Sequence, residues 1–174
     1  MKIIIAKTAG FCFGVHRAVD AVYESRKKYR TISTLGPIIH NPQVVSELER
    51  AGIKAVDSPE EANTEAVVIR SHGCTPEDKR KLAEKGIAIV DATCPFVAKI
   101  QRIAEEAYGA GEQVVIVGEA NHPEVIGING YCGNKAIIIN SINEAKKIPY
   151  TKKKLCLVAQ TTTNQENWQI IVEF

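Results

Sequence analysis

The chain has 174 residues, of which 45% are hydrophobic and 24% charged, and its net charge is +2. This composition is typical of a globular protein and excludes intrinsic disorder and fibrous repeats. The small net charge argues against a nucleic acid or a membrane surface as partner, because such partners select for strongly basic chains. The apolar runs are too short for a bilayer span or a secretion signal, so we expect a cytoplasmic protein.

Short β-branched runs predict strands along the whole chain. In chain order, strands are expected at residues 2–7, 31–35, 66–70, 88–91, 113–117, 136–140 and 155–160. Apolar residues at i, i+3 and i+4 predict helices between them, at residues 15–28, 43–51, 77–84 and 96–108, with another after the last strand. Several strands are apolar on both faces, which is typical of parallel strands covered by helices. The alternation predicts an α/β fold with small, mostly parallel sheets.

One local pattern occurs four times: a strand ends, a polar loop carries His or Cys, and Pro begins a helix. The four segments read IIHNPQVV, RSHGCTPED, DATCPFVA and EANHPEVI. Pro suits the first helical turn, where its missing N–H has no partner to lose. The pattern therefore places four side chains at the carboxyl ends of parallel strands, where open α/β sheets bind ligands: His40, His72, Cys94 and His122. Helix N-termini at this edge favour an anion, phosphate above all.

The five cysteines are scattered, at positions 12, 74, 94, 132 and 156, and no two have C-x-x-C spacing. This argues against a disulfide framework and against a zinc ribbon. Cys12, in AGFCFGVHRAV, precedes a helix whose dipole would stabilise a thiolate, which suits an iron–sulfur ligand. The alternative is a buried core cysteine. Cys94 precedes a Pro and is either a second ligand or a small residue at a helix start.

Two further polar residues lie at strand ends. Glu124 follows His122-Pro123 and either complements a helix dipole or donates protons within a pocket. Thr161, in the run QTTTN, offers a hydroxyl to a ligand or caps a helix. Four other residues are expected to have no ligand role: His16 within the first helix, Cys74 before a helix start, Cys132 as an incidental turn thiol, and Cys156 in a strand core.

Six motifs, in this order, closely resemble those of the 4-hydroxy-3-methylbut-2-enyl diphosphate reductase family: AGFCFGVHRAV, GPIIHNPQVV, IRSHG, DATCPFV, NHPEVIGINGY and AQTT. The resemblance covers essentially the whole chain. It implies that an allylic hydroxy-diphosphate loses its terminal hydroxyl to give isopentenyl and dimethylallyl diphosphates, in the non-mevalonate isoprenoid pathway. It also implies a trefoil of three small α/β domains around a 4Fe-4S cluster, with a ferredoxin- or flavodoxin-type electron donor.

The resemblance also implies a role for each candidate residue. Cys12 and Cys94 are the expected cluster ligands, and Glu124 is the expected proton-delivering acid. The expected substrate-binding residues are His40, His72 and His122 for the diphosphate, with Thr161 for the substrate hydroxyl.

The chain departs from the family pattern in one large respect. The family uses a third cysteine from a later domain, and Ser and Asn side chains for the diphosphate, and none of these has a counterpart here. We therefore expect two of three domains: a strand and ligand loop at residues 1–13 that would pack with the missing domain, an α/β domain at 14–93, and an incomplete one at 94–174. Such a chain is expected to be inactive alone.

Two other functions are compatible with the residues. A non-catalytic α/β module would use the histidines to bind a phosphorylated ligand and would purify without colour. A Cys–His hydrolase would use Cys94 or Cys12 as its nucleophile and would react rapidly with a thiol alkylator. A dinucleotide-binding fold is disfavoured, because no G-x-G-x-x-G follows a strand.

Overall fold

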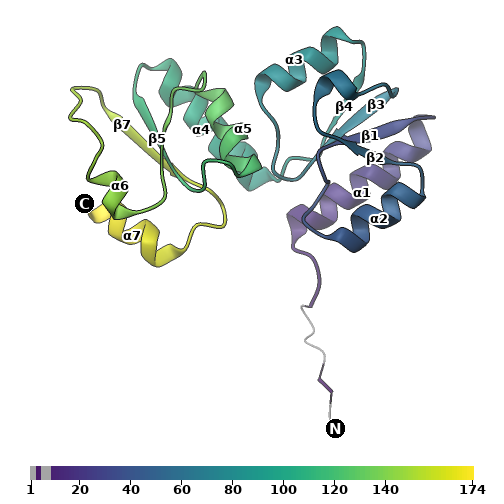
Figure 1. The fold of residues 1–174 in the computed structure, drawn as a ribbon, viewed down its shortest axis with the longest axis horizontal. Helices are drawn as coiled ribbons and strands as arrows, with labels where there is room; N and C mark the ends of the chain where they lie inside the picture. Colours follow the sequence, from purple (N-terminus) through teal and green to yellow (C-terminus); the bar gives the residue numbers. More distant parts are fainter. Residues whose placement is uncertain (1–2, 5–8) are drawn as a thin grey trace.

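A computed structural model describes residues 3–4 and 9–174. The described residues form two α/β lobes that follow one another along the chain (Figure 1). Each lobe has one small sheet in which every strand pair is parallel. The predicted α/β class with parallel sheets is confirmed. Among the described helices, none combines the length and the apolar character that a bilayer crossing requires.

The first lobe contains a four-stranded sheet in the order β2-β1-β3-β4. Its strands are β1 (Ile32–Leu35), β2 (Lys54–Val56), β3 (Ala66–Ile69) and β4 (Ala88–Asp91). Its helices are α1 (Phe13–Lys28), α2 (Pro42–Arg50), the short 3-10 helix η1 (Pro59–Glu61) and α3 (Pro76–Glu84).

The second lobe contains a three-stranded sheet in the order β6-β5-β7. Its strands are β5 (Gln113–Val117), β6 (Ile137–Ile139) and β7 (Leu155–Ala159). Its helices are α4 (Pro95–Gly109), α5 (Pro123–Tyr131), α6 (Ile142–Ala145) and α7 (Gln165–Glu173).

Strand β3 explains why the strand sequences lack a polar alternation. All four of its residues are buried. Val68 packs with Ala18 of α1 on one face, whereas Val67 and Ile69 pack with Leu82 of α3 on the other. Both faces of the strand are therefore core, and an apolar residue is needed at every position.

The central strand of the second lobe has the same two-sided environment. Ile116 packs with Ile128 of α5, whereas Val115 and Val117 share a core with Ile171 of α7. Figure 1 shows α4 and α5 on one side of this sheet and α6 and α7 on the other. Helices thus cover both faces of each sheet, and the strand ends are left as the edge where loops gather.

The two lobes repeat one order of elements. The first runs α1-β1-α2-β2-η1-β3-α3-β4 and the second runs α4-β5-α5-β6-α6-β7-α7. In both, the first strand of the lobe lies between the second and the third. The loops before α1 and α4 therefore correspond, as do those before α2 and α5. Strand β3 pairs with β1 and β4, whereas β7 pairs with β5 alone among the described strands.

The structure departs from the sequence-based elements at three short segments and at the N-terminus. Strand β2, η1 and α6 were not predicted, because three or four residues are too few to show a period. The strand predicted at residues 2–7 falls mostly outside the described residues. Ile3 and Ile4, which are described, are exposed and belong to no strand.

The lobes meet where α5 contacts the loop that leads into α3. A side chain at Gly130 would place its Cβ 2.8 Å from Cβ of Thr75, and one at Gly127 would approach the carbonyl of His72. Nζ of Lys79 in α3 donates to the hydroxyl of Tyr131 at 3.1 Å. Glycines on one face of α5 thus allow the second lobe to approach the loop that carries His72.

Candidate functional site

Three histidines meet between the two lobes. His40 follows β1, His72 follows β3, and His122 is the N-cap residue of α5. The ring centroids of His40 and His72 are 4.6 Å apart, those of His72 and His122 are 5.3 Å apart, and those of His40 and His122 are 5.9 Å apart. One ring nitrogen from each lies within 4.8 Å of the other two. The structure thus brings together all three of the histidines that precede a Pro-initiated helix.

The N-cap role of His122 determines which of its nitrogens is a donor. Nδ1 of His122 accepts a hydrogen bond from the backbone N–H of Glu124 at 3.1 Å. A neutral imidazole with an accepting Nδ1 carries its proton on Nε2. A metal-bound histidine has the opposite arrangement, with its free nitrogen donating to a neighbour. This hydrogen bond therefore favours an anion over a metal ion at the three rings.

His72 is held in its neutral form. Burial, as the largest cause, and the nearby His40, His122 and Arg70 together lower its pKa from 6.5 to about 4. At neutral pH, His72 therefore offers an N–H donor to a ligand and carries no positive charge. An anion bound beside it would oppose these effects and raise its pKa.

Glu124, at the start of α5, and Thr161, in the loop after β7, form a hydrogen-bonded pair in the second lobe. Glu124 is only 1% exposed, on the first turn of α5. Its Oε2 accepts from Oγ1 of Thr161 at 2.7 Å, and its Oε1 accepts from the backbone N–H of Thr161 at 2.6 Å. Both carboxylate oxygens therefore have a donor, which offsets the cost of burying the group.

Gln160 fixes the loop that carries Thr161. Its backbone N–H donates to the carbonyl of Val117, and its side-chain Oε1 accepts from the N–H of Glu119 at 3.1 Å. Its Nε2 donates to Oγ1 of Thr162 at 2.7 Å. A Cβ at Gly118 would lie 2.9 Å from this side chain. Gln160 therefore ties the loop after β7 to the loop after β5, which leads to His122.

Two cysteines occupy corresponding positions in the two lobes. Cys12 is the N-cap of α1 and is exposed, and Cys94 is the N-cap of α4 and is half-buried. Neither thiol caps its helix with a hydrogen bond. Both sulfur atoms are thus available to a ligand from the side of the cavity.

The start of α1 is fixed to the loop that carries Cys94. Nη1 of Arg17 donates to the carbonyl of Thr93 at 2.7 Å. The backbone N–H of Cys94 donates to the carbonyl of Ser71 at 2.9 Å. A Cβ at Gly14 would lie 2.7 Å from Sγ of Cys94, so α1 can approach this closely only with glycine there.

All seven predicted site residues line one cavity of about 730 Å³. They come from both lobes and from six segments of the chain: Cys12, His40, His72, Cys94, His122, Glu124 and Thr161. Ser71, Lys99 and Thr162 also line it and were not predicted. Ser71 stands next to His72 in the quoted motif IRSHG, whereas nothing in the sequence marks Lys99. The rest of the lining is mainly apolar, with Phe13, Phe96, Val97, Ile100 and Ile103.

The other three cysteines lie in cores. Burial raises the pKa of the Cys74 thiol to about 12 and that of Cys132 to about 11. Cys132 lies in the turn that ends α5, as expected, but it is fully buried, with its thiol near the carbonyls of Ala104 and Ile128. Cys156 lies in β7 and packs against the same core, as expected. His16, on the surface of α1, lies with its ring centroid 6.0 Å from that of Phe11.

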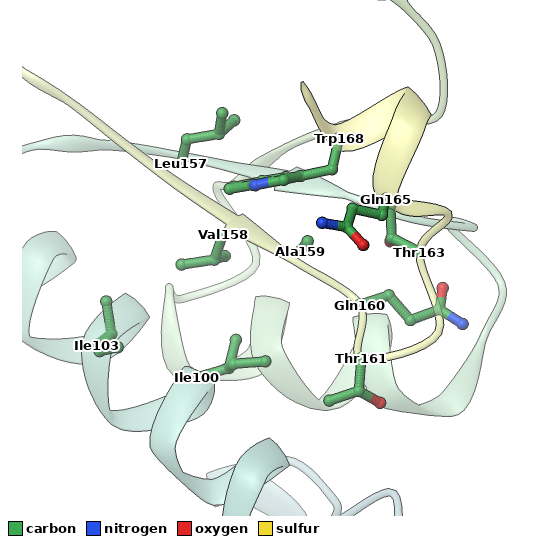
Figure 2. Close-up of a pocket in the computed structure, with 10 residues that line it drawn as sticks. All are labelled: Ile100, Ile103, Leu157, Val158, Ala159, Gln160, Thr161, Thr163, Gln165 and Trp168. Carbon is green, nitrogen blue, oxygen red and sulfur yellow. The ribbon is translucent and has the colours of Figure 1, made fainter. Parts of the chain in front are cut away.

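A second cavity, of about 420 Å³, continues from the first along β7. It shares Ile100, Ile103 and Thr161 with the main cavity. Figure 2 shows the indole of Trp168 lying over β7, with Ile100 and Ile103 of α4 on the opposite wall. The apolar wall of the site therefore extends to the edge of β7 that pairs with no described strand.

Comparison with known proteins identifies the family. The model of the LytB protein family matches residues 3–174. The 4-hydroxy-3-methylbut-2-enyl diphosphate reductase of Caldanaerobacter subterraneus subsp. tengcongensis is 47% identical over 178 residues, which cover 99% of this chain and 62% of that protein. The protein of the same name from Alkaliphilus oremlandii is 48% identical over 164 residues, covering 93% of this chain and 58% of that protein.

Solved structures agree with these relatives. The Plasmodium falciparum E-1-hydroxy-2-methyl-but-2-enyl-4-diphosphate reductase superposes with a TM-score of 0.90 at 28% identity, covering 96% of this chain and 54% of that one. A second solved structure is described as (E)-4-hydroxy-3-methyl-but-2-enyl diphosphate reductase, the terminal enzyme of the non-mevalonate pathway. It superposes with a TM-score of 0.85 at 42% identity, covering 98% of this chain and 62% of that one. The chain thus spans about three fifths of the length of its relatives. Its motifs, fold and matches agree, and the chain belongs to the LytB protein family.

Proposed function

We propose that this chain forms the substrate-binding part of a cytoplasmic 4-hydroxy-3-methylbut-2-enyl diphosphate reductase. The observation that carries the proposal is the single cavity in which histidines, thiols and a buried carboxyl group from both lobes meet. The names of the relatives support reduction of an allylic hydroxy-diphosphate. The resemblance of the motifs implies that the hydroxyl group is lost and that the products are isopentenyl and dimethylallyl diphosphates.

The diphosphate binds at the three imidazoles in this proposal. Nε2 of His122 carries a proton because Nδ1 accepts from the backbone, and the neutral His72 offers a single N–H. The lining residue Lys99 adds a positive charge. Hydrogen bonds to a charged acceptor are stronger than neutral ones, so N–H donors suffice for recognition without three charged imidazoles.

The thiols of the cavity fit two positions of a 4Fe-4S cluster site. Cys12 and Cys94 cap their helices without using the sulfur atom, and Gly14 leaves the space beside Cys94 that a Cβ would fill. We propose these two as ligands, with a third cysteine from the part of the relatives that this chain does not span. A bound cluster, reduced by a ferredoxin or flavodoxin, would supply electrons and a Lewis-acidic iron.

Glu124 and Thr161 handle the proton and the hydroxyl group. The 2.7 Å hydrogen bond between Oγ1 of Thr161 and Oε2 of Glu124 is a direct path for a proton. Reductive loss of the hydroxyl group takes two electrons and two protons. Protonated Glu124 gives the proton with which the hydroxyl leaves as water, solvent supplies the second proton, and Thr161 orients the hydroxyl. Glu124 is only 1% exposed, and Val97 and Ile100 add apolar lining to the same cavity.

Pyrophosphate binding by the 174-residue chain tests the diphosphate site. Calorimetry should give weaker binding, by about 10- to 100-fold, for His40→Ala and for His122→Asn, since each removes one donor to a charged ligand. Asn is chosen at 122 because it preserves the N-cap of α5. His16→Ala, on the surface of α1, is the matched control and should bind as the wild type. Equal affinity of all four proteins would contradict the proposal.

The cluster and the acid are tested separately. In the full-length form, with the third cysteine present, iron content after anaerobic reconstitution should fall in Cys12→Ser and Cys94→Ser but not in Cys156→Ser, which lies in β7. For turnover, the chain is joined to the remaining segment of the Caldanaerobacter relative. Glu124→Gln should then reduce turnover by about 100-fold or more while pyrophosphate affinity is retained. Normal turnover of this variant would exclude Glu124 as the acid.

A further inference from the structure

Three buried side-chain polar atoms lack a hydrogen-bond partner among the described residues, and one of them is Nε of Arg70. The other two are Nε2 of Gln101 and Nδ1 of His72. Burying a polar group without a partner costs about 1–3 kcal/mol, so such atoms are rare in native proteins and need an explanation. The Gln101 atom is an amide donor, and the His72 atom is an acceptor in one neutral tautomer of the imidazole. Their chemistry is therefore complementary.

Gln101 interrupts an apolar face of α4. The helix buries Val97, Ala104 and Ala107 on the same side, and Gln101 among them is only 4% exposed. A long polar side chain at this position is unexpected, since an apolar residue of the same size would pack there without an unsatisfied amide.

The amide of Gln101 lies against the residue that follows His72. A Cβ at Gly73 would be 2.5 Å from Nε2 of Gln101, so the amide occupies the space that a side chain at position 73 would take. On the other side, a Cβ at Gly127 of α5 would be 3.2 Å from the same nitrogen and 3.7 Å from the carbonyl oxygen of His72. Gln101 therefore lies where α4, α5 and the His72 loop meet.

We propose that Gln101 is a positioning residue for His72, donating a hydrogen bond from its Nε2 to Nδ1 of the imidazole. Gly73 and Gly127 leave the space in which this amide lies beside the His72 loop. It fixes the tautomer of His72 with the proton on Nε2, as the backbone N–H of Glu124 does for His122. Two imidazoles, one from each lobe, then present N–H donors to one ligand. This inference rests on the proposed diphosphate site, because fixed donors serve an anionic ligand.

The tautomer of His72 can be read directly from the imidazole nitrogen resonances of the ¹⁵N-labelled 174-residue chain at neutral pH. The wild type should show His72 protonated on Nε2 alone. Gln101→Met has a similar volume and no donor, so it should give a mixture of both tautomers. Gln169→Met, on the exposed face of α7, is the matched control and should leave the spectrum of His72 unchanged.

Pyrophosphate affinity and thermal stability separate a positioning role from a packing role. Gln101→Met should weaken pyrophosphate binding by about five- to tenfold, since the loss of a fixed donor is worth about one hydrogen bond. The variant should melt no lower than the wild type, because it removes a buried amide. A lower melting temperature with unchanged affinity would assign Gln101 to packing alone and overturn the proposal.

The wild-type spectrum decides the proposal even if a variant does not fold. A His72 protonated on Nδ1, or a wild-type mixture of tautomers, would overturn it. Failure of the diphosphate site itself has a different signature: the wild type would show no pyrophosphate binding, while the tautomer of His72 would still respond to Gln101→Met.

Discussion

Glu124 combines deep burial with a full set of donors. Its two carboxylate oxygens accept from the backbone and from the hydroxyl of Thr161, which lies 37 residues further along the chain. A buried carboxyl group is tolerated only where such donors replace water. The pair therefore depends on the loop after β7, and this loop depends in turn on the side chain of Gln160.

Removing the Thr161 hydroxyl should destabilise the protein measurably. Thr161→Val keeps the side-chain shape but leaves Oε2 of the buried Glu124 without a partner. We expect the free energy of unfolding to fall by about 1–3 kcal/mol in chemical denaturation. Thr161→Ser, which retains the hydroxyl, should stay close to the wild type. If both variants lost the same stability, the effect would come from packing and the hydrogen bond would be unimportant.

The lowered pKa of His72 predicts the sign of a pH effect on stability. Its pKa is about 4 in the folded chain and 6.5 as the unperturbed value, so between these values the unfolded state binds more protons. The stability contribution of neutral His72 is therefore complete above about pH 6.5 and is lost as the pH falls toward 4. Chemical denaturation at several pH values in this range measures the effect. As the pH falls, the free energy of unfolding should decrease less for His72→Asn than for the wild type. Identical pH profiles would contradict this assignment.

Corresponding helix starts of the two lobes carry corresponding chemistry. Cys12, Cys94 and His122 are the N-cap residues of α1, α4 and α5, while His40 lies one residue before Asn41, the N-cap of α2. A Pro at the first turn of α2, α4 and α5 leaves the preceding residue outside the helix, beside its N–H groups. The repeat of elements thus places equivalent ligand groups around one cavity.

Strand pairing predicts a gradient of protection within the second lobe. Strand β5 pairs with both β6 and β7, whereas β7 pairs with β5 alone among the described strands, and its other edge borders the cavity in Figure 2. Amide hydrogens of β5 should therefore exchange more slowly than those of β7, because fewer openings expose a strand that is paired on both sides. Hydrogen–deuterium exchange by NMR measures this, with β3 and β4 as the corresponding pair in the first lobe. Equal protection of β5 and β7 would be evidence that the open edge of β7 is covered in solution.

At the scale of the whole molecule, the site exists only where the lobes are held together. His72 comes from the first lobe and His122 from the second, and their ring centroids are 5.3 Å apart. Close approach of α5 to the His72 loop is possible because Gly127 and Gly130 have no side chain to meet it. The glycines of α5 thus serve the assembly of the site, at a cost in intrinsic helix stability.

Adding one methyl group at Gly130 should weaken ligand binding without unfolding either lobe. Gly130→Ala places a Cβ 2.8 Å from Cβ of Thr75 and forces α5 away from the first lobe. Gly109→Ala, also at a helical glycine, meets nothing within 4 Å and is the matched control. We expect weaker pyrophosphate binding for Gly130→Ala, with the circular dichroism of both lobes retained, and wild-type binding for Gly109→Ala. Unchanged binding in both variants would mean that the contact between the lobes does not matter for the site.

The sequence by itself determined the features that depend on neighbours along the chain. Apolar runs such as AVVI in β3 and VVIV in β5 indicated buried parallel strands, and Pro after His or Cys marked the helix starts. These signals are local, because strand burial and helix capping act over a few residues. They were sufficient to place His40, His72 and His122 at strand ends, and the family motifs supplied their expected roles. The elements that escaped prediction, β2, η1 and α6, are too short for such a period.

Only the tertiary structure decided which strand-end residues meet and in what chemical state. The neutral form of His72 comes from its burial and from the neighbouring His40, His122 and Arg70. The partnership of Glu124 with Thr161 and the clamp by Gln160 join segments far apart in the sequence. In the sequence, nothing distinguishes Gln101 from the other polar residues of a helix. In the structure, α4 packs it against Gly73 and Gly127. These properties depend on how the two lobes dock, and docking is decided by contacts between side chains that no local pattern connects.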